Sequence, residues 1–474
     1  MYYPYTSTII AIVLALATPS FAIAQTAPMD AFRLENAVNA PDWLTIRGEV
    51  RARYETLDGQ FRARGSGSDQ ALALRTLILA EANLKAINLP GVTFGGEVQD
   101  ARLELDDAGT PLSTSNVNAL DMLQAYVRFD LDGLLQQKDV ALTFGRQTLG
   151  IGSSRVLERV DMANVIFSYT GAYWRSVSPR GDELHLVYVS PVGRLPTTLA
   201  SLGDNEIVAD KEEWGRIFWG AHYRRPKAFE GLISDTWAEG FVYRLDERDT
   251  SDVQTPNRDY WQPGFRILRA PKEGRSDFEI EASYRTGSRR ATSAPSDTHD
   301  LDVDAWTLHA HWGWSVTSDW NWRFSVDYDF ASGDKNPNDG RFDRFERLFG
   351  GRRTDLGNTG IFGPLTPANL IAPGARVEIA PSSRLDARIA YKAAYLASAT
   401  DGWTDARLQD PSGQSGRFIG HTIDTRLRYW FVPSSVRGEV GTSVLFPGRF
   451  ARTAPNAPQN DQTLFGYASV TFSF

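Results

Sequence analysis

The feature that most constrains this chain is an alternation of apolar and polar residues that recurs along almost the whole sequence. One run carries Leu44, Ile46, Val50, Ala52 and Tyr54 on one face and Thr45, Arg47, Glu49, Arg51, Arg53 and Glu55 on the other. A period of two residues is typical of a β-strand, because successive side chains point to opposite sides. The pattern therefore predicts strands with one apolar face and one polar face.

Segments of this kind predict eighteen strands. They cover residues 43–57, 70–86, 91–105, 119–133, 138–148, 164–175, 181–190, 214–224, 236–246, 260–269, 276–286, 303–316, 320–331, 374–380, 384–398, 420–431, 435–447 and 463–474. Short links such as 432–434 alternate with long ones such as 331–373. Bacterial outer-membrane barrels have an even strand number, short periplasmic turns and longer outer loops. We therefore predict an all-β, transmembrane, antiparallel up-and-down β-barrel of about 18 strands.

Composition agrees with a barrel and excludes other classes. The mean hydropathy of -0.33 would suit a soluble protein, but half of each barrel strand faces water and hides the lipid-facing half in the average. Beyond the N-terminus, no stretch reaches the roughly 18 consecutive apolar residues that a spanning helix needs. The absence of cysteine excludes disulfides, thiolate metal sites and cysteine nucleophiles.

The N-terminus predicts export. An apolar run from Thr8 is followed by Ala22-Ile23-Ala24, an A-x-A cleavage pattern before Gln25. We predict a signal peptide over residues 1–24, a short periplasmic segment over 25–42 and the barrel over 43–474. The alternative for the first segment is a buried N-terminal helix.

The C-terminal strand ends on an aromatic residue of its apolar face, Phe474. Such an ending is similar to the signal read by the barrel-assembly machinery, which we expect as a partner during biogenesis. The predicted location is the cell outer membrane. Pairing of this strand with the one at 43–57 would close the barrel and remove an exposed sheet edge.

The basic residues are mainly arginine: only 7 of the 50 are lysine. Arginine offers a planar fork of donors that binds carboxylates in pairs, which suits fixed positions in a confined pore. A GC-rich genome is the alternative explanation of this bias.

The polar faces assign a set of arginines to the lumen as pore-lining, substrate-binding residues. They are Arg47, Arg51, Arg53, Arg75, Arg128, Arg216, Arg244, Arg285, Arg323, Arg388, Arg426 and Arg428. The carboxylates assigned to the lumen with them are Glu49, Glu81, Glu97, Asp130, Glu279, Glu281, Asp327, Asp329, Asp386 and Asp424. Cross-strand pairing would lock many arginines into ion pairs that only stiffen the wall. Surplus arginines would form a ladder for carboxylates, with Arg47, Arg51, Arg53, Arg426 and Arg428 as first candidates.

Other chemistry finds little support. The run from Asp334 to Phe345 departs from the EF-hand pattern and predicts a surface turn. His309 and His311 would point into the lumen together, without enough further ligands for a metal. There is no phosphate-binding or nucleophile-elbow motif. Ser415 and His421 are the one candidate pair for a hydrolase.

Several sequence blocks resemble a known family. Phe144-Gly145-Arg146-Gln147 precedes Ser154-Arg155-Val156-Leu157, the run 331–340 leads into Phe345-Glu346-Arg347-Leu348-Phe349, and Asn369-Leu370-Ile371 precedes an Arg-bearing strand. These blocks are similar to the alginate-export family of outer-membrane barrels, over nearly the whole mature chain. The resemblance implies an 18-stranded barrel whose Arg-rich lumen passes an anionic uronic-acid polymer. The best-known members are occluded by loops on both sides, but here the only extended periplasmic link is 225–235.

The leading hypothesis is a passive outer-membrane channel for anionic polysaccharide or oligosaccharide, of the type of alginate-like uronates. The alternatives are a general or small-acid uptake porin and, from another class, an outer-membrane enzyme or an adhesin that displays the 331–373 loop. We expect no enzymatic activity, no cofactor, no metal and no nucleic-acid partner. The expected partners are outer-membrane lipid, an anionic carbohydrate substrate and periplasmic export or uptake proteins.

Overall fold

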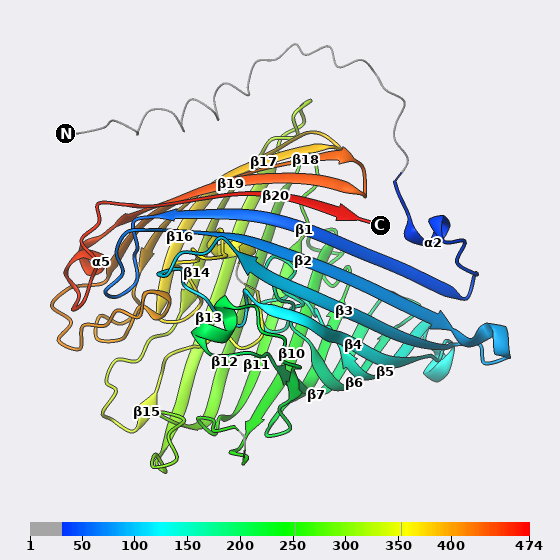
Figure 1. Ribbon diagram of the computed structural model, residues 1–474, viewed down its shortest axis with the longest axis horizontal. Helices are drawn as coiled ribbons and strands as arrows, with labels where there is room; N and C mark the ends of the chain where they lie inside the picture. The colour runs from blue at the N-terminus through cyan, green and yellow to red at the C-terminus, as the bar shows by residue number, and fades with distance from the viewer. Residues whose placement is uncertain (1–30, 252, 352) are drawn as a thin grey trace.

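The computed structural model describes residues 31–474, apart from residues 252 and 352. The predicted signal peptide, residues 1–24, and the first residues of the predicted periplasmic segment lie outside the described residues. Within the described part, eighteen strands close into one antiparallel barrel, and β1 (Leu44–Asp58) lies beside β20 (Thr463–Ser473) (Figure 1). No helix of this part is long and apolar enough to cross a membrane.

The remaining elements follow in chain order. The other barrel strands are β2 (Ser68–Asn83), β3 (Val92–Glu104), β4 (Asn118–Asp130), β5 (Asp139–Gln147), β6 (Tyr169–Val177), β7 (Glu183–Gly193), β9 (Arg216–Arg225), β10 (Thr236–Glu247), β11 (Asp259–Arg269), β12 (Ser276–Arg290), β13 (Asp300–Ser315), β14 (Arg323–Ala331), β16 (Leu370–Ser382), β17 (Leu385–Tyr395), β18 (Phe418–Val432) and β19 (Val436–Pro447). The loops contain the two-residue strands β8 (Lys211–Glu212) and β15 (Arg341–Phe342). Short helices are α2 (Leu34–Ala37), α3 (Leu199–Gly203), α4 (Arg353–Leu356), α5 (Arg449–Thr453), η1 (Leu84–Ile87), η2 (Leu134–Gln136) and η3 (Thr404–Ala406).

The predicted fold is confirmed, since each of the eighteen predicted strands overlaps one barrel strand. The register closes the ring: Arg53 of β1 lies opposite Ala73 on one side and Ser469 on the other. The largest difference is at β6, which begins at Tyr169 rather than at residue 164. The five residues before it belong to a loop that the barrel wall holds by hydrogen bonds from Asn164.

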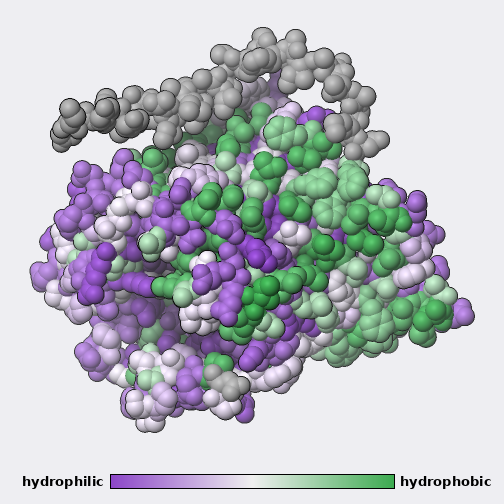
Figure 2. Space-filling view, in the orientation of Figure 1, coloured by the Kyte–Doolittle hydropathy of each residue, from purple (hydrophilic) through white to green (hydrophobic). Residues whose placement is uncertain are grey.

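The two faces of the strands meet different surroundings. In β1, Arg51, Arg53 and Glu55 are buried inside, whereas Val50 and Tyr54 are exposed on the outside. Figure 2 shows apolar side chains gathered on the outer wall, over the N-terminal strands at its lower right. In a barrel of this kind the apolar side chains face the hydrocarbon of the lipid bilayer. The outward face is therefore the one that contacts the membrane.

Loop lengths define the two ends of the barrel. Turns of two or three residues, 383–384 and 433–435, lie at one end, and the long connections lie at the other. The link 226–235 has mostly exposed residues and does not plug the barrel. Two long outer connections instead fold inward, and we call them loop 148–168 and loop 332–369. They determine the shape of the channel.

Candidate functional site: the channel interior

Loop 148–168 is held against the inner wall by three arginines of adjacent strands. Arg51 donates to the carbonyl oxygens of Asp161 (2.9 Å) and Ala163 (2.7 Å). Arg75 donates to the same two oxygens, each at 2.8 Å. Arg53 donates to the carbonyl oxygen between them, that of Met162, at 2.6 Å. Three successive backbone carbonyl groups therefore accept hydrogen bonds from three guanidinium groups.

These arginines differ in their counter-ions. Arg53 forms an ion pair with Glu55 at 2.5 Å, and Arg75 one with Glu49 at 2.5 Å. Arg51 has no carboxylate within ion-pair distance among the described residues, although its side chain is 5% exposed. Its direct hydrogen-bond partners are all neutral oxygens.

Two cavities lie on either side of Met162. The outer chamber, of about 150 Å³, is lined by Arg53, Met162, Glu158, Arg347 and loop residues of the outer end. The inner chamber, of about 340 Å³, is lined by Arg51, Arg53, Arg75, Arg428, Arg437, Glu49, Glu439, Asp161, Met162 and Ser469. Since Arg53 and Met162 line both, the narrow part of the path lies at these two residues.

The path continues to the periplasmic end. A cavity of about 520 Å³ shares Glu49 and Asp161 with the inner chamber and is also lined by Arg47 and Phe474. Another, of about 360 Å³, shares Arg428 and is lined by Arg323, Arg426 and Asp386. The cavity of about 360 Å³ is lined mainly by residues of β13 to β17 and their turns. The inner chamber and the cavity of about 520 Å³ follow one another along the wall formed by β18, β19, β20, β1 and β2. This wall contains the closure of the barrel, and we call it the seam wall.

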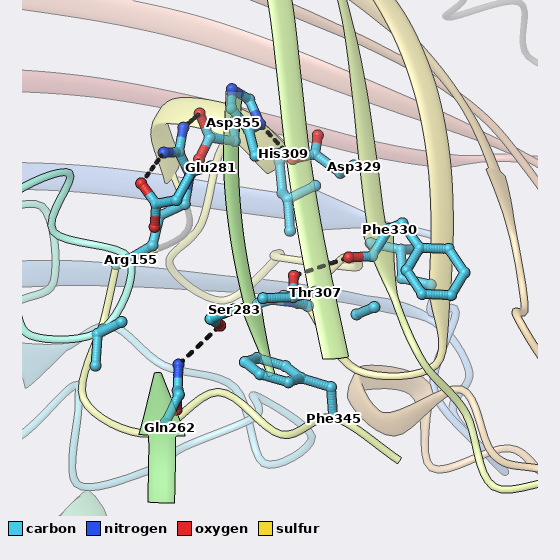
Figure 3. A pocket seen from close by; sticks show the side chains of 16 residues that line it. Arg155, Gln262, Glu281, Ser283, Thr307, His309, Asp329, Phe330, Phe345 and Asp355 are labelled. Carbon is cyan, nitrogen blue, oxygen red and sulfur yellow. Dashed lines mark hydrogen bonds and ion pairs between the residues drawn. The ribbon is translucent and has the colours of Figure 1, made fainter. Parts of the chain in front are cut away.

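The opposite wall carries a closed network of charges. Arg155 of loop 148–168 lies between Asp355 of α4 (2.8 Å) and Glu281 of β12 (2.9 Å), and it also pairs with Glu279 (Figure 3). Arg266 of β11 pairs with Glu279 at 3.0 Å. Every cation of this group faces carboxylates, so the arginine of the loop ties both inward loops to β12.

The two inward loops also bind each other directly. Leu157 and Phe349 form an isolated parallel bridge, and the amide of Glu158 donates to the Phe349 carbonyl at 3.1 Å. Gly350 lies so close that a Cβ atom there would overlap the carbonyl group of Arg155. The loops therefore form one unit, and their contact requires a glycine at this point.

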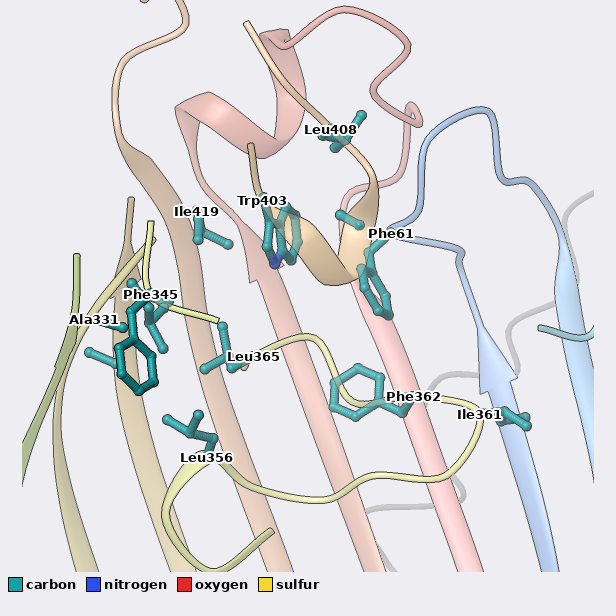
Figure 4. Packing of buried hydrophobic residues seen from close by; sticks show 14 of the residues in the cluster. Phe61, Ala331, Phe345, Leu356, Ile361, Phe362, Leu365, Trp403, Leu408 and Ile419 are labelled. Carbon is teal, nitrogen blue, oxygen red and sulfur yellow. The ribbon is translucent and has the colours of Figure 1, made fainter. Parts of the chain in front are cut away.

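Loop 332–369 is anchored mainly by packing inside the barrel. Phe362 stacks on Phe465 of β20, and Phe61 contacts both Phe362 and Trp403 (Figure 4). The Asn358 carboxamide donates to Ser443 Oγ at 3.0 Å. The outer half of the lumen therefore contains a hydrophobic core, where a simple open pore would hold water.

His309, Asp329 and Asp355 could in principle hold a metal, since their ligand atoms lie within 4.8 Å of one another. The surroundings do not fit this role. The Lys392 ammonium bonds Asp329 at 2.7 Å and also pairs with Asp327, and Arg155 pairs with Asp355. Protonated side chains thus already fill the position that a cation would take.

Several carboxyl groups in the loops have raised pKa values, among them Glu158 and Asp210. Burial and the nearby carboxylate of Asp161 raise the pKa of Glu158 in the outer chamber to about 6. Burial and the Asp121 carboxylate raise the pKa of Asp210 to about 7. Arg155 instead lowers the pKa of Asp355 strongly, against the effect of burial.

The predicted pore arginines are found in several environments. Arg47, Arg323, Arg426 and Arg428 line the periplasmic-side cavities, and the last two share Asp386. Arg128 pairs with Asp130, Arg216 pairs with Glu247, Arg285 donates to the carbonyl of Glu346, and Arg388 lies opposite Arg426. Many of them therefore have structural partners.

Arg244 was predicted to lie in the lumen, and this is wrong. It shares the outward face of β10 with exposed Val242, pairs with Asp259 at 2.9 Å and lies over the ring of Trp261. The inward residues here are Tyr243 and Leu245, which are buried in the hydrophobic core. The polar face points outward because loop 332–369 makes the inside of this strand apolar.

Other residues of the path were missed by the sequence analysis. Arg437 lines the inner chamber and has no carboxylate within ion-pair distance among the described residues, and its guanidinium lies 5.4 Å from the centre of the Trp430 ring. Arg437 is two residues from Glu439 in β19 and so lies on the same face of the strand. The alternation of this strand could therefore have identified it. Arg155 and Arg347 could not, since they lie in irregular loops.

The hydrolase pair does not form. His421 Nδ1 bonds the hydroxyl of Tyr391 at 2.7 Å, and both side chains lie on the outward face. Ser415 is buried in its loop, where its amide donates to Asp410.

The predicted turn at 334–339 consists of hydrogen bonds between side chains and backbone amides, such as Asp334 Oδ1 accepting from the Asn336 amide.

Comparisons with known proteins agree with this architecture. The profile of a family described as alginate export matches residues 42–465. Among solved structures, OccAB2 of Acinetobacter baumannii is similar with a TM-score of 0.58 at 15% identity, covering 91% of this chain and 98% of that one. OccK2 (OpdF) of Pseudomonas aeruginosa, in complex with glucuronate, is similar with a TM-score of 0.55 at 11% identity, covering 91% and 98%. No curated protein sequence matches.

Proposed function

Since this chain belongs to the alginate-export family and is an outer-membrane channel, we propose that it conducts anionic carbohydrate of the uronate type by passive diffusion. The observation that carries this proposal is the inner chamber, where five arginines stand against three carboxylates among the lining residues. Guanidinium groups bind carboxylates through charge-assisted hydrogen bonds, and such sites select anions.

The length of the substrate is open within this proposal. The two inward loops leave an outer chamber of only about 150 Å³, which favours short oligosaccharides or single sugar acids over a long polymer. OccK2, a barrel of the same fold, has been solved with glucuronate, a single uronate. The second candidate is therefore a small-acid uptake porin, and it is supported by the same loops.

An enzymatic or adhesive role has weaker support. The family and the similar structures are channels, and Ser415 and His421 each bind other partners. For biogenesis, we expect the barrel-assembly machinery to recognise the strand that ends at Phe474. Outer-membrane lipid surrounds the barrel, and periplasmic export or uptake proteins remain expected partners.

Planar bilayers test the proposal. The reversal potential under a salt gradient should show a preference for anions, and glucuronate and a polyuronate should both be compared as blockers of the single-channel current. Block by the short acid at lower concentration than block by the polymer would support the small-acid candidate. Preference for cations would contradict the proposal in either form.

A further inference from the structure

The hydrogen bonds that hold residues 161–163 have an unusual chemistry. Backbone carbonyls are neutral acceptors, yet here they occupy the guanidinium groups of Arg51, Arg53 and Arg75. Arg51 and Arg75 are directly opposite each other in the register, so their like charges lie close together. Arg53 and Arg75 already pair with Glu55 and Glu49, but Arg51 has no ion pair, and a carboxylate would stabilise it better than carbonyl dipoles do because it adds the attraction between opposite charges to the hydrogen bonds.

A carboxylate can reach these groups from the inner chamber. The chamber is lined by the same three arginines and by Arg437, which has no carboxylate partner of its own within the described chain. Its volume of about 340 Å³ is within the usual range of small-ligand sites, roughly 300–1,000 Å³. The Asp161 carboxylate lines the same space with its side chain 69% exposed, and it pairs with Arg159 at 3.0 Å.

Residues 161–163 lie between two anchored points of loop 148–168, so they can move away from the arginines while the rest of the loop stays in place. After it, Asn164 donates to the carbonyl oxygens of Leu74, Arg102 and Asn116, at distances of 3.2, 3.0 and 2.8 Å. Before it, Arg159 pairs with Glu97 at 2.9 Å. The residues between these anchors include Val160, whose φ of 60° is a left-handed conformation that a β-branched residue adopts only under strain.

We propose that residues 161–163 are a gate released by the substrate, in which a uronate carboxylate displaces the backbone carbonyls from Arg51 and Arg75. The inference rests on the proposed function, because it assumes an anionic substrate. The bonds exchanged are hydrogen bonds alone. Release of the segment moves Met162 away from Arg53 and joins the two chambers.

Cysteine labelling tests the gate, since the chain contains no cysteine of its own. In the full-length reconstituted channel, Met162→Cys keeps the backbone carbonyl, and its thiol should react with a membrane-impermeant reagent several-fold faster in glucuronate than in glucose. Thr359→Cys, on loop 332–369 beside the outer chamber, is the matched control and should react at the same rate in both. Adding Val160→Gly to the Met162→Cys channel relieves the strain of the closed segment and should reduce the effect of glucuronate on the labelling rate.

The labelling rates and the ion preference of the channel together distinguish a failure of the proposed gate from a failure of the proposed function. Protection of the thiol at position 162 by glucuronate, or an unchanged rate, in a channel whose currents still prefer anions would overturn the gate and leave the proposed function standing. A channel that prefers cations would overturn both.

Discussion

The two walls of the lumen satisfy their arginines in different ways. On the wall of β10 to β17, Arg266 pairs with Glu279 (3.0 Å), and Lys392 pairs with Asp329 (2.7 Å). On the seam wall, Arg51 binds only neutral oxygens and Arg437 lies over a tryptophan ring. Arginines with a carboxylate, which include Arg53 and Arg75 of the seam wall, are therefore structural, whereas Arg51 and Arg437 are chemically available. What decides the role of an arginine is the presence of a carboxylate within reach.

The largest expected effect comes from breaking the closed wall. Lys392→Met would leave Asp327 and Asp329 buried beside each other without the lysine, with His309 beside Asp329 alone, at a cost of about 3–5 kcal/mol. The unfolding temperature, followed by the gel mobility of the folded barrel, should fall markedly. Lys138→Met, at an exposed position, is the control and should leave it unchanged. An equal effect of the two substitutions would show that this wall does not depend on its ion pairs.

Next comes the contact that joins the two loops between the walls. Gly350→Ala places a Cβ atom against the Arg155 carbonyl group, closer than any real contact allows, so the backbones must move apart. The single-channel conductance should rise several-fold. Gly231→Ala, with nothing within 4 Å of the added atom, should behave as the unchanged protein. Unaltered conductance of the Gly350 variant would mean that the loops do not limit the current.

The third prediction concerns the seam wall. Arg437→Gln removes a cation of the inner chamber and should weaken block by glucuronate about tenfold, the equivalent of one hydrogen bond to a charged group. Arg244→Gln removes the same charge from the outward face and should leave the block unchanged. Equal effects of the two variants would indicate that only the net charge of the protein matters.

The smallest effect is a dependence on pH from loop 148–168. The pKa of Glu158 is raised to about 6 from 4.5, so the folded protein binds this proton more tightly than the unfolded chain does. Its contribution to stability is therefore lost as the pH rises from 4.5 to about 6. Ionisation adds a negative charge to the outer chamber, so anion preference, measured by reversal potentials, should decrease between about pH 5 and about pH 7.5. Glu158→Gln should remove this change.

The strands could be predicted because their signal is local. Alternation within about ten residues locates β1 or β14 without knowledge of the partner strand. The inward path of the loops could not be predicted in this way. Asn164 and Asn358 hold them by carboxamide bonds to distant backbone, and such bonds leave no periodic trace in the sequence.

The candidate site was predictable where the inside of a strand is polar. Arg51 and Arg53 lie on the inside, where the lumen beside them contains a polar chamber and a loop backbone. Arg244 does not, because Tyr243 and Leu245 face a hydrophobic core that fills the outer half of the lumen. The rule that the polar face of a strand points inward therefore fails wherever an inward loop fills the lumen with apolar side chains.

The position of the gate on the seam has a consequence for the order of folding. β1 and β20 come from opposite ends of the chain, and contacts so distant in sequence form late. Ser469, which lies between Arg53 and Glu439 in the register, can complete the inner chamber only when this last pairing is made. The inner chamber, the proposed substrate site, therefore forms in the same step that completes the barrel, and an unfinished barrel has no such chamber.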